Sequence, residues 1–406
     1  MLSVHEARER ILAQFSPLDT TRCPLELAAS RVLAETIRAE SDLPAFDNSS
    51  VDGFAVRAMD VAEVPVILPV VADVPAGKAP NFRLQAGQAA RIMTGAMLPA
   101  GADAVVMVED TDFGHRAAGA SAPQQVCIQK TVRPGENLRK RGADLRAGQE
   151  ILPKGQVLRP QDIGMLAMLG AATVPVYRKP KVAIVSSGDE LLPVDAPPED
   201  GKIHDTNTYT LAAMAAQTGC EVLRLGVAAD RREAIQAILD QAVEAGVDVI
   251  VSSAGVSVGA FDFVKEVVES AGTLDFWKVN MRPGKPLAFG SYRGIPFFGL
   301  PGNPVSSFVG FLVFARPALR RLGGLEAARQ DTVRVVLAEA VESDGRESYL
   351  RAVVTRENGI STARLTGHQG SGNLFSLVQA NALLIIPSGV KSCPPGTEVE
   401  AWLLEN

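Results

Sequence analysis

Hydrophobic runs and helical patterns alternate along the chain from Lys181 to about Arg321. Three apolar runs have the length and composition of buried strands: 181–187 (KVAIVSS), 220–228 (CEVLRLGVA) and 247–253 (VDVIVSS). Three segments have helical patterns that end at a glycine: 208–219, 230–246 and 262–272. Asp230 and Glu233 predict a capping box at the start of the second helix. Strands that alternate with helices predict a parallel sheet covered on both faces.

The flanking segments have the pattern of β domains. Residues 65–135 hold short apolar runs separated by proline and glycine, which predicts a small β domain. Residues 331–404 repeat this style and predict a C-terminal β barrel. Between 139 and 178 the pattern predicts hairpin-like strands and a helix that starts at Pro160. We expect residues 22–43 to pair with that piece.

Length and charge bound the possible functions. The chain has 406 residues, which is too long for one typical core, so about two to four domains are expected. Its composition, 47% hydrophobic and 21% charged, is ordinary for a globular protein. The net charge of −6 argues against a nucleic-acid partner, although it leaves room for a local basic pocket that binds a small anion.

The cysteines indicate the compartment. Cys23, Cys127, Cys220 and Cys393 lie far apart and form no C-x-x-C pair. This spacing predicts reduced thiols in a cytoplasmic protein rather than a disulfide framework or a zinc site. No apolar run approaches the roughly 18 residues of a membrane span, so no membrane partner is expected. The N-terminal segment MLSVHEARERIL is patterned as a charged amphipathic helix and not as a signal peptide.

A run of small and flexible residues, SSAGVSVGAFD (252–262), follows the third predicted strand. Glycine lets a backbone approach a ligand closely, and the exposed N–H groups of such a loop can cradle an anion at a helix start. The alternative is a tight strand-to-helix turn with Asp262 as its N-cap. The loop by itself leaves both interpretations open.

Other loops at the same predicted sheet edge carry related chemistry. SSGDEL (186–191) is a second glycine turn, MRPGKPLAFG (281–290) places Arg282 and Lys285 around a Pro-Gly turn, and GLPGNPVSSF (299–308) leads into a helix with Ser306 in its first turn. Cations, backbone donors and hydroxyls are the groups that bind oxyanions. Asp230 and Asp262 both follow strands and are candidate oxygen ligands for Mg²⁺, or else helix caps.

Two stretches outside this region are also rich in polar groups. LPAFDNSSVDGFAVR (43–57) is an acidic, hydroxylated loop that suits a metal or a nucleotide, or simply a turn. RPGENLRKRGADLRAG (133–148) is a local basic run, which is either an anion patch or a solvated charge run. No Ser-His-Asp or Cys-His pairing is evident, so covalent catalysis is not indicated.

A set of motifs follows one another along the chain: FDNSSVDGFAVR, RIMTGAMLPAGADAVVMVED, GENLRKRGAD, SSGDEL, IHDTN, SSAGVSVGAFD, FWKVNMRPGKP, GLPGNPVS and GHQGSG. Their order resembles that of the bacterial molybdopterin molybdenumtransferases, the MoeA family, and is similar to the E domain of gephyrin. The resemblance covers nearly the whole chain. Molybdopterin adenylyltransferases share only the α/β domain.

The resemblance implies a multidomain fold of α/β and β parts in an elongated homodimer. A three-layer α/β domain of the molybdopterin-binding type is expected over 1–21 and 173–325. A segmented dimerisation domain is expected over 22–43 and 140–172, a small β domain over 44–139, and the β barrel over 326–406.

The resemblance further implies insertion of molybdenum from molybdate into adenylylated molybdopterin, with Mg²⁺ as cofactor and AMP as a product. The residues implied in catalysis are Asp52, Asp144, Glu190, Asp230 and Asp262. Among these, the last three are expected to serve Mg²⁺. The residues implied in substrate binding are Thr94, Arg139, Ser257, Lys278, Arg282, Lys285, Ser306, Arg351 and Ser371. A molybdopterin adenylyltransferase is a further expected partner. Adenylyltransferase activity and a gephyrin-like scaffold role remain as alternatives.

Two positions depart from the family pattern. Arg282 stands where many members carry lysine, so the charge is kept but the group is planar and bidentate. Ala254 stands where glycine is usual in the phosphate-type loop, and its Cβ is tolerated only with a negative φ.

Overall fold

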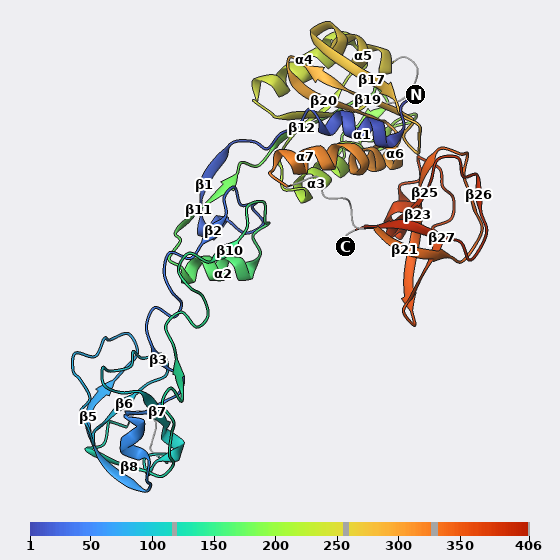
Figure 1. The fold of residues 1–406 in the computed structure, drawn as a ribbon. Helices are drawn as coiled ribbons and strands as arrows, with labels where there is room; N and C mark the ends of the chain where they lie inside the picture. Colours follow the sequence, from blue (N-terminus) through green and yellow to red (C-terminus); the bar gives the residue numbers. More distant parts are fainter. Residues whose placement is uncertain (116–119, 255–259, 326–331, 405–406) are drawn as a thin grey trace. The chain divides into compact units, whose positions relative to one another are not determined.

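The computed structural model describes residues 1–115, 120–254, 260–325 and 332–404 (Figure 1). The chain divides into two compact units. The first consists of Met1–Glu35, Lys154–Ile163 and Ala172–Asn406, and the second of Thr36–Pro153 and Gly164–Ala171. In the described residues, no helix is both long and apolar enough to cross a membrane.

A six-stranded sheet forms the centre of the α/β domain, in the order β15–β12–β16–β20–β19–β17. The strands are β12 (Lys181–Ser187), β15 (Glu221–Ala228), β16 (Val249–Ala254), β17 (Gly272–Lys278), β19 (Pro286–Tyr292) and β20 (Ile295–Pro301). The three strands predicted from the sequence run parallel, as expected, and β20 runs parallel to them. β19 is antiparallel to both of its neighbours, so the sheet is mixed.

Helices cover both faces of this sheet, which gives the predicted three layers. Figure 1 shows α4 (Arg232–Glu244) and α5 (Ala260–Ala271) on one side, and α1 (Val4–Leu12), α3 (Asn207–Gln217), α6 (Pro304–Gly310) and α7 (Arg316–Leu322) on the other. Alternate residues of β12 face opposite layers, because Val182 and Ile184 belong to the α1/α3 core and Ala183 and Val185 to the α4/α5 core. A π-helical turn, Phe311–Ala315, lies between α6 and α7.

The expected capping box of Asp230 and Glu233 is wrong, and so is the alternative that made Asp262 an N-cap. The N-cap of α4 is Arg231 and makes no side-chain cap bond, because Asp230 lies one residue earlier, where its N–H donates to Asp189. α5 already begins at Ala260, so Asp262 lies inside its first turn rather than at the cap. A full capping box does occur on α1, where Ser3 and Glu6 exchange hydrogen bonds.

The predicted C-terminal barrel is confirmed. Its strands are β21 (Thr332–Leu337), β23 (Glu347–Glu357), β24 (Ile360–Leu365), β25 (Ala382–Ile386) and β27 (Glu398–Leu403). They follow the order β23–β24–β21–β27–β25, and a pairing between β25 and β23 closes the barrel. β18 (Met281–Arg282) adds to β23, so the Pro-Gly turn after Arg282 is fixed at the barrel. α8 (Phe375–Gln379), β22 (Val341–Glu342) and β26 (Ser392–Cys393) complete this part.

The second unit contains the predicted small β domain. Its five-stranded sheet consists of β4 (Gly53–Val56), β5 (Val66–Val74), β6 (Ala89–Ile92), β7 (Ala104–Met107) and β8 (Gln125–Ile128). Two shorter pairs are β3 (Asn48–Ser49) with β9 (Leu138–Arg139), and β2 (Ile37–Arg38) with β10 (Glu150–Leu152).

The remaining elements are short. α2 (Pro160–Met168) starts at Pro160 as expected. In the first unit β1 (Thr20–Pro24) pairs with β11 (Thr173–Tyr177), and β13 (Leu191–Leu192) with β14 (Ile203–His204). 3₁₀ turns occupy Leu25–Leu27, Ala58–Val61 and Val108–Asp110.

Candidate functional site

A cavity of about 570 Å³ opens where β12, β16 and β20 end. Four segments form its walls: the SSGDEL turn, the start of α3, the Pro-Gly turn before α6, and residues 370–374 of the barrel part. They contribute Glu190, Asn207, Asn303 and Gly372, in that order. The carboxyl ends of parallel strands are where α/β domains bind ligands. Two of the loops predicted to share this edge, SSGDEL (186–191) and GLPGNPVSSF (299–308), therefore line this cavity.

A polar network beneath the cavity holds the strand ends in place. The Ser186 hydroxyl donates to the carbonyl of Ser253 at 2.7 Å. The Asn207 amide donates to the Ser253 hydroxyl at 2.8 Å and to the carbonyl of Gly302 at 2.6 Å. Sequence reasoning gave Asn207 no role, although it lies in the IHDTN motif. Its two hydrogen bonds join the start of α3 to Ser253 and Gly302, which lie 46 and 95 positions away in the sequence. These bonds make the floor of the cavity rigid.

Acidic groups gather on one side of this edge. The pKa of Asp230 lies above its usual value, first because of burial and then because of the negative charges of Asp189 and Glu190. The Oδ1 atom of Asp230 is buried and has no hydrogen-bond partner. At Gly188, φ is +152°, a conformation that favours glycine, and the carboxylate of Glu190 folds back over this turn, with Oε2 2.6 Å from the position that a Cβ would take.

These acids fit a magnesium ion that is only partly held by protein. In the described residues, no three side chains of His, Cys, Asp and Glu come together as a metal site. Mg²⁺, however, commonly takes one or two carboxylates and completes its shell with water and substrate phosphate oxygens. A buried carboxylate oxygen without a partner, as in Asp230, is the kind of ligand that such an ion needs.

Asp230→Asn is expected to stabilise the protein at pH 7. A carboxyl whose pKa is raised in the folded state destabilises the fold when it is ionised. This destabilisation is absent at pH values well below the ordinary pKa of 3.8, and it is complete at pH values above the pKa of the folded protein. The melting temperature should therefore rise by roughly 1–3 °C at pH 7 and stay unchanged near pH 3.

Thermal melts of both proteins at the two pH values check this. Asp240→Asn is the matched control, because the Asp240 carboxylate accepts bonds from Tyr292 (2.6 Å) and Arg293 (3.1 Å), and its loss should lower the melting temperature. A lower melting temperature for Asp230→Asn at pH 7 contradicts the prediction.

A basic loop lies next to the start of α6. In the Pro-Gly turn after β18, Gly284 has φ +103°, and its Cβ position is 3.6 Å from the carbonyl oxygen of Ser306. The backbone of Lys285 accepts a hydrogen bond from Val279 at 3.0 Å, which closes the turn. Lys285 and Lys278 are exposed, Arg282 is half-buried, and Ser306 is buried. The predicted contacts Arg282, Lys285 and Ser306 thus lie in adjoining segments.

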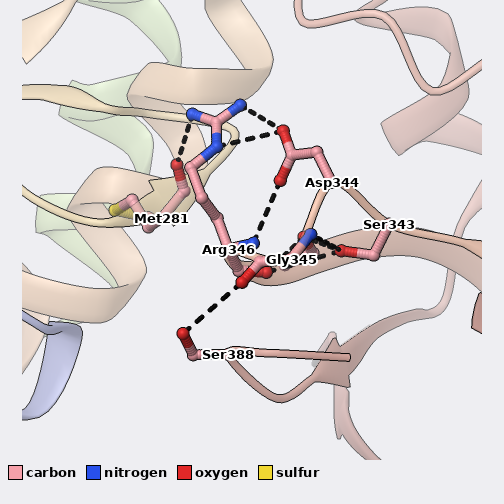
Figure 2. A network of polar contacts seen from close by, with 7 residues as sticks. Met281, Ser343, Asp344, Gly345, Arg346 and Ser388 are labelled. Carbon is pink, nitrogen blue, oxygen red and sulfur yellow. Dashed lines mark hydrogen bonds and ion pairs between the residues drawn. The ribbon is translucent and has the colours of Figure 1, made fainter. Parts of the chain in front are cut away.

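The turn is braced from the barrel part by Arg346, which sequence reasoning missed. Figure 2 shows Arg346 between Asp344 and the backbone of Met281. One guanidinium nitrogen donates to the Met281 carbonyl at 3.0 Å, and another donates to the Asp344 carboxylate at 3.0 Å. These bonds hold the pKa of Asp344 below its usual value. No local pattern in the sequence marks this brace, because it joins residues 65 positions apart.

Arg351 is the largest fully buried side chain among the described residues. Its Nε donates to the Ser376 hydroxyl at 2.9 Å, and one terminal nitrogen donates to the carbonyl of Gly370 at 3.0 Å. The other terminal nitrogen has no partner. Burial, followed by the positive charge of nearby Arg282, lowers the pKa of Arg351 to about 10. Two cations held close together, with a donor to spare, form an environment that favours an anion.

The segment that carries Ser371 is attached to α6. The Ser371 carbonyl accepts a hydrogen bond from the N–H of Val305 at 3.1 Å. Its neighbours Gly370 and Gly372 contact Arg351 and line the cavity, respectively. The structure therefore brings together the segments of Ser306, Ser371 and Arg351, although they come from distant parts of the sequence.

The predicted residues of the second unit form two local pairs. Both the N–H and the hydroxyl of Thr94 donate to one Asp52 oxygen at 2.8 Å. Arg139 forms an ion pair with Asp144. Two more cations of the basic run are also paired, Lys140 with Asp47 at 3.0 Å and Arg141 with Asp42 at 2.7 Å. The middle of the run, 139–141, is thus a set of ion pairs more than an open anion patch.

Two predicted positions fall outside the described part. Ser257 belongs to the residues that the structure leaves out, and so does the side chain of Asp262. The proposed anion cradle of the 252–262 loop lies there as well.

Comparisons with known proteins match the whole chain. Family models match residues 2–170 as the MoeA N-terminal region (domain I and II), 183–321 as a probable molybdopterin binding domain, and 334–404 as the MoeA C-terminal region (domain IV). The chain is 40% identical to the molybdopterin molybdenumtransferase of Nostoc sp. (95% of this chain, 88% of the relative). It is 38% identical to molybdopterin molybdenumtransferase 2 of Mycobacterium tuberculosis (99% of both).

Solved structures give the same match. Two crystal structures of the molybdopterin biosynthesis MoeA protein from Pyrococcus horikoshii superpose with TM-scores of 0.85 and 0.78. They are 33% and 32% identical to this chain, and both chains are covered fully.

Proposed function

Because this chain belongs to the molybdopterin molybdenumtransferase (MoeA) family, we propose that it inserts molybdenum from molybdate into adenylylated molybdopterin and releases AMP. The role in molybdenum cofactor biosynthesis follows from the family; the substrates, the nucleotide product and the residues are the proposal.

The observation that carries it is the buried Arg351, whose second terminal nitrogen has no partner and whose neighbouring segment, 370–372, reaches the cavity. Burial of this cation is unfavourable, and the nearby positive charge of Arg282 adds to the cost, as the lowered pKa of Arg351 indicates. A tetrahedral dianion such as molybdate removes that cost, since charge-assisted hydrogen bonds to arginine are strong. Lys285 and the hydroxyls of Ser306 and Ser371, on segments joined to the same place, supply further donors.

The acids on the other side of the cavity are assigned to the adenylate. Glu190 and Asp230 would hold Mg²⁺ there, with Asp262 from the start of α5 as a third candidate. When bound, the ion neutralises charge on the substrate pyrophosphate. The chain's own groups bind and orient the two substrates. No protein nucleophile is needed, because the two dithiolene sulfurs of molybdopterin replace one oxygen of molybdate, which leaves as water with the two thiol protons. In the second unit Asp52, Thr94, Arg139 and Asp144 are proposed substrate contacts and supports.

The test is nucleotide turnover by the purified chain. Given adenylylated molybdopterin, molybdate and Mg²⁺, it should release AMP and form molybdenum cofactor without consuming ATP. Consumption of ATP would instead identify an adenylyltransferase, and no turnover of either kind would leave only a scaffold role.

Asp262→Asn is expected to slow AMP release at least about tenfold, the effect of weakening a metal-binding group. Asparagine has the same shape and is tolerated in a first helical turn, so the fold should survive. AMP release at saturating substrate, measured over a Mg²⁺ titration, gives the result. If the variant turns over at the wild-type rate at every Mg²⁺ concentration, Asp262 serves only the helix.

The proposal includes a homodimer in the cytoplasm. The predicted contacts are spread over both compact units, from Asp52 to Ser371, which suits a pocket completed by a partner subunit. The four cysteines are all free, as suits a reducing compartment.

A further inference from the structure

A second cavity, of about 400 Å³, adjoins the candidate site on the side of β15. The two cavities share the lining residues Leu191 and Asp205. Consecutive residues of the SSGDEL turn also divide between them, because Asp189 lines the second cavity and Glu190 lines the first. A ligand with two ring systems and a charged linker can therefore place one ring in each cavity, with the linker beside these two acids.

A cation stacked on an aromatic ring forms part of the wall of this second cavity. The guanidinium carbon of Arg224 lies 3.7 Å from the centre of the Tyr209 ring, and both side chains are exposed. Pro193, Val194 and Val227 add apolar surface beside them. Nucleic bases stack on guanidinium groups and on aromatic rings, because every base has a flat π face. This wall therefore suits a flat heteroaromatic ring.

β15 brings its backbone to the second cavity through Gly226. β15 is the end strand of the sheet, so among the described strands it has a partner on one side only. Its pairing with β12 skips Leu225, since Arg224 lies opposite Ile184 and Gly226 lies opposite Val185. At Gly226 φ is +91°, which favours glycine, and a Cβ there would meet no atom within 4 Å. This bulge therefore leaves space for a ring whose polar edge pairs with backbone groups.

The acids of the candidate site lie between the two cavities. The Asp189 carboxylate accepts a hydrogen bond from the N–H of Asp230 at 3.1 Å, which attaches the SSGDEL turn to the end of β15. The negative charges of Asp189 and Glu190 also act on Asp230. A pyrophosphate can cross this acidic place only together with a cation, and Mg²⁺ commonly binds both carboxylates and substrate phosphates.

We propose that the second cavity binds the adenine base and ribose of the adenylylated substrate, and that Arg224 and Tyr209 form the stacking surface for the base. The inference rests on the proposed function, which supplies a substrate with two ring systems. The volume falls in the range of small-molecule sites, roughly 300–1,000 Å³. The pterin then occupies the first cavity, and base recognition belongs to α3 and β15 rather than to the loops that bind molybdate.

Calorimetric titration of the full chain with AMP, at one fixed Mg²⁺ concentration, tests the proposal. Ribose 5-phosphate is the reference ligand, because it is AMP without the base. Wild type should bind AMP at least about tenfold more tightly than ribose 5-phosphate. Arg224→Ala should weaken AMP binding about tenfold and leave ribose 5-phosphate binding unchanged. Arg356→Ala, which removes an exposed arginine of β23, should change neither.

Arg224→Lys separates stacking from charge. Lysine keeps the positive charge but has no planar group, so this variant should bind AMP as weakly as Arg224→Ala does. Wild-type affinity in Arg224→Lys would mean that Arg224 attracts the phosphate, and it overturns the base site. Equal AMP affinity in wild type and Arg224→Ala overturns it as well. Arg224 is exposed, so both variants should fold normally.

Failure of this inference is distinguishable from failure of the proposed function, because AMP release from adenylylated molybdopterin is measured separately. Arg224→Ala should raise KM for that substrate about tenfold and leave kcat unchanged, the result of losing contacts to a part that does not react. If wild type releases AMP but binds AMP no more tightly than ribose 5-phosphate, the base site is wrong and the proposed function stands. If wild type releases no AMP yet binds it through Arg224, the cavity is a nucleotide site and the proposed reaction is wrong.

Discussion

Replacing Arg351 by alanine should weaken molybdate binding at least about a hundredfold and also lower the stability of the barrel part. The side chain is completely buried, and its removal leaves the Gly370 carbonyl without that donor and opens a hole beside Ser376. An unsatisfied buried polar group costs about 1–3 kcal/mol, and the cavity adds to that. Binding suffers separately, because the spare guanidinium nitrogen beside Arg282 is lost.

Arg351→Met separates the two effects. A buried charge can be replaced by an apolar group of similar volume with little loss of stability, so this variant should melt much closer to wild type than Arg351→Ala does. Both variants should nevertheless fail to bind molybdate. Arg356→Ala, on the same strand but exposed, is the control and should change neither property.

Molybdate titrations and thermal melts of the four proteins give the answer. If Arg351→Met binds molybdate as well as wild type does, Arg351 serves only the packing of the barrel, and the proposed function loses its main support.

Much of the α/β domain was predictable because its signals are local. Val182 and Ile184 alternate with Ala183 and Val185, and this period identified a strand with two buried faces. Glycines such as Gly219 marked helix ends directly. The antiparallel β19 was not distinguished from its neighbours, because the direction of a strand depends on the connection around it and not on its own pattern.

The predictions that failed or were missed concern residues whose environment depends on partners far away in the sequence. Asp230 has the spacing of a helix cap, yet burial near Asp189 and Glu190 gives it a different environment. The resemblance pointed to Arg351, but its complete burial depends on barrel closure, which no local pattern encodes. Asn207 and Arg346 act through partners 95 and 65 residues away, so their roles appear only once the chain has folded.

Lys285→Ala should weaken the binding of molybdopterin or molybdate about ten- to hundredfold and leave the fold intact. The side chain is exposed, and the turn that carries it is closed by backbone atoms, the Val279 N–H and the Lys285 carbonyl. Alanine keeps that bond. The loss is therefore that of one charge-assisted hydrogen bond, roughly 1.5–3 kcal/mol, and the melting temperature should stay within a few degrees of wild type.

The matched control is Lys78→Ala, another exposed lysine beside a glycine with positive φ, Gly77. Titrations of all three proteins with molybdopterin and with molybdate, at one fixed salt concentration, isolate the contribution of Lys285, because salt screens exposed charges. A solvated surface lysine predicts equal dissociation constants for Lys285→Ala and wild type. That result would remove Lys285 from the site and confine the oxyanion contacts to Arg282, Arg351 and the α6 side. If only Lys285→Ala loses affinity and Lys78→Ala binds like wild type, the Lys285 side chain contacts the anion, since Lys285→Ala and wild type have the same turn backbone.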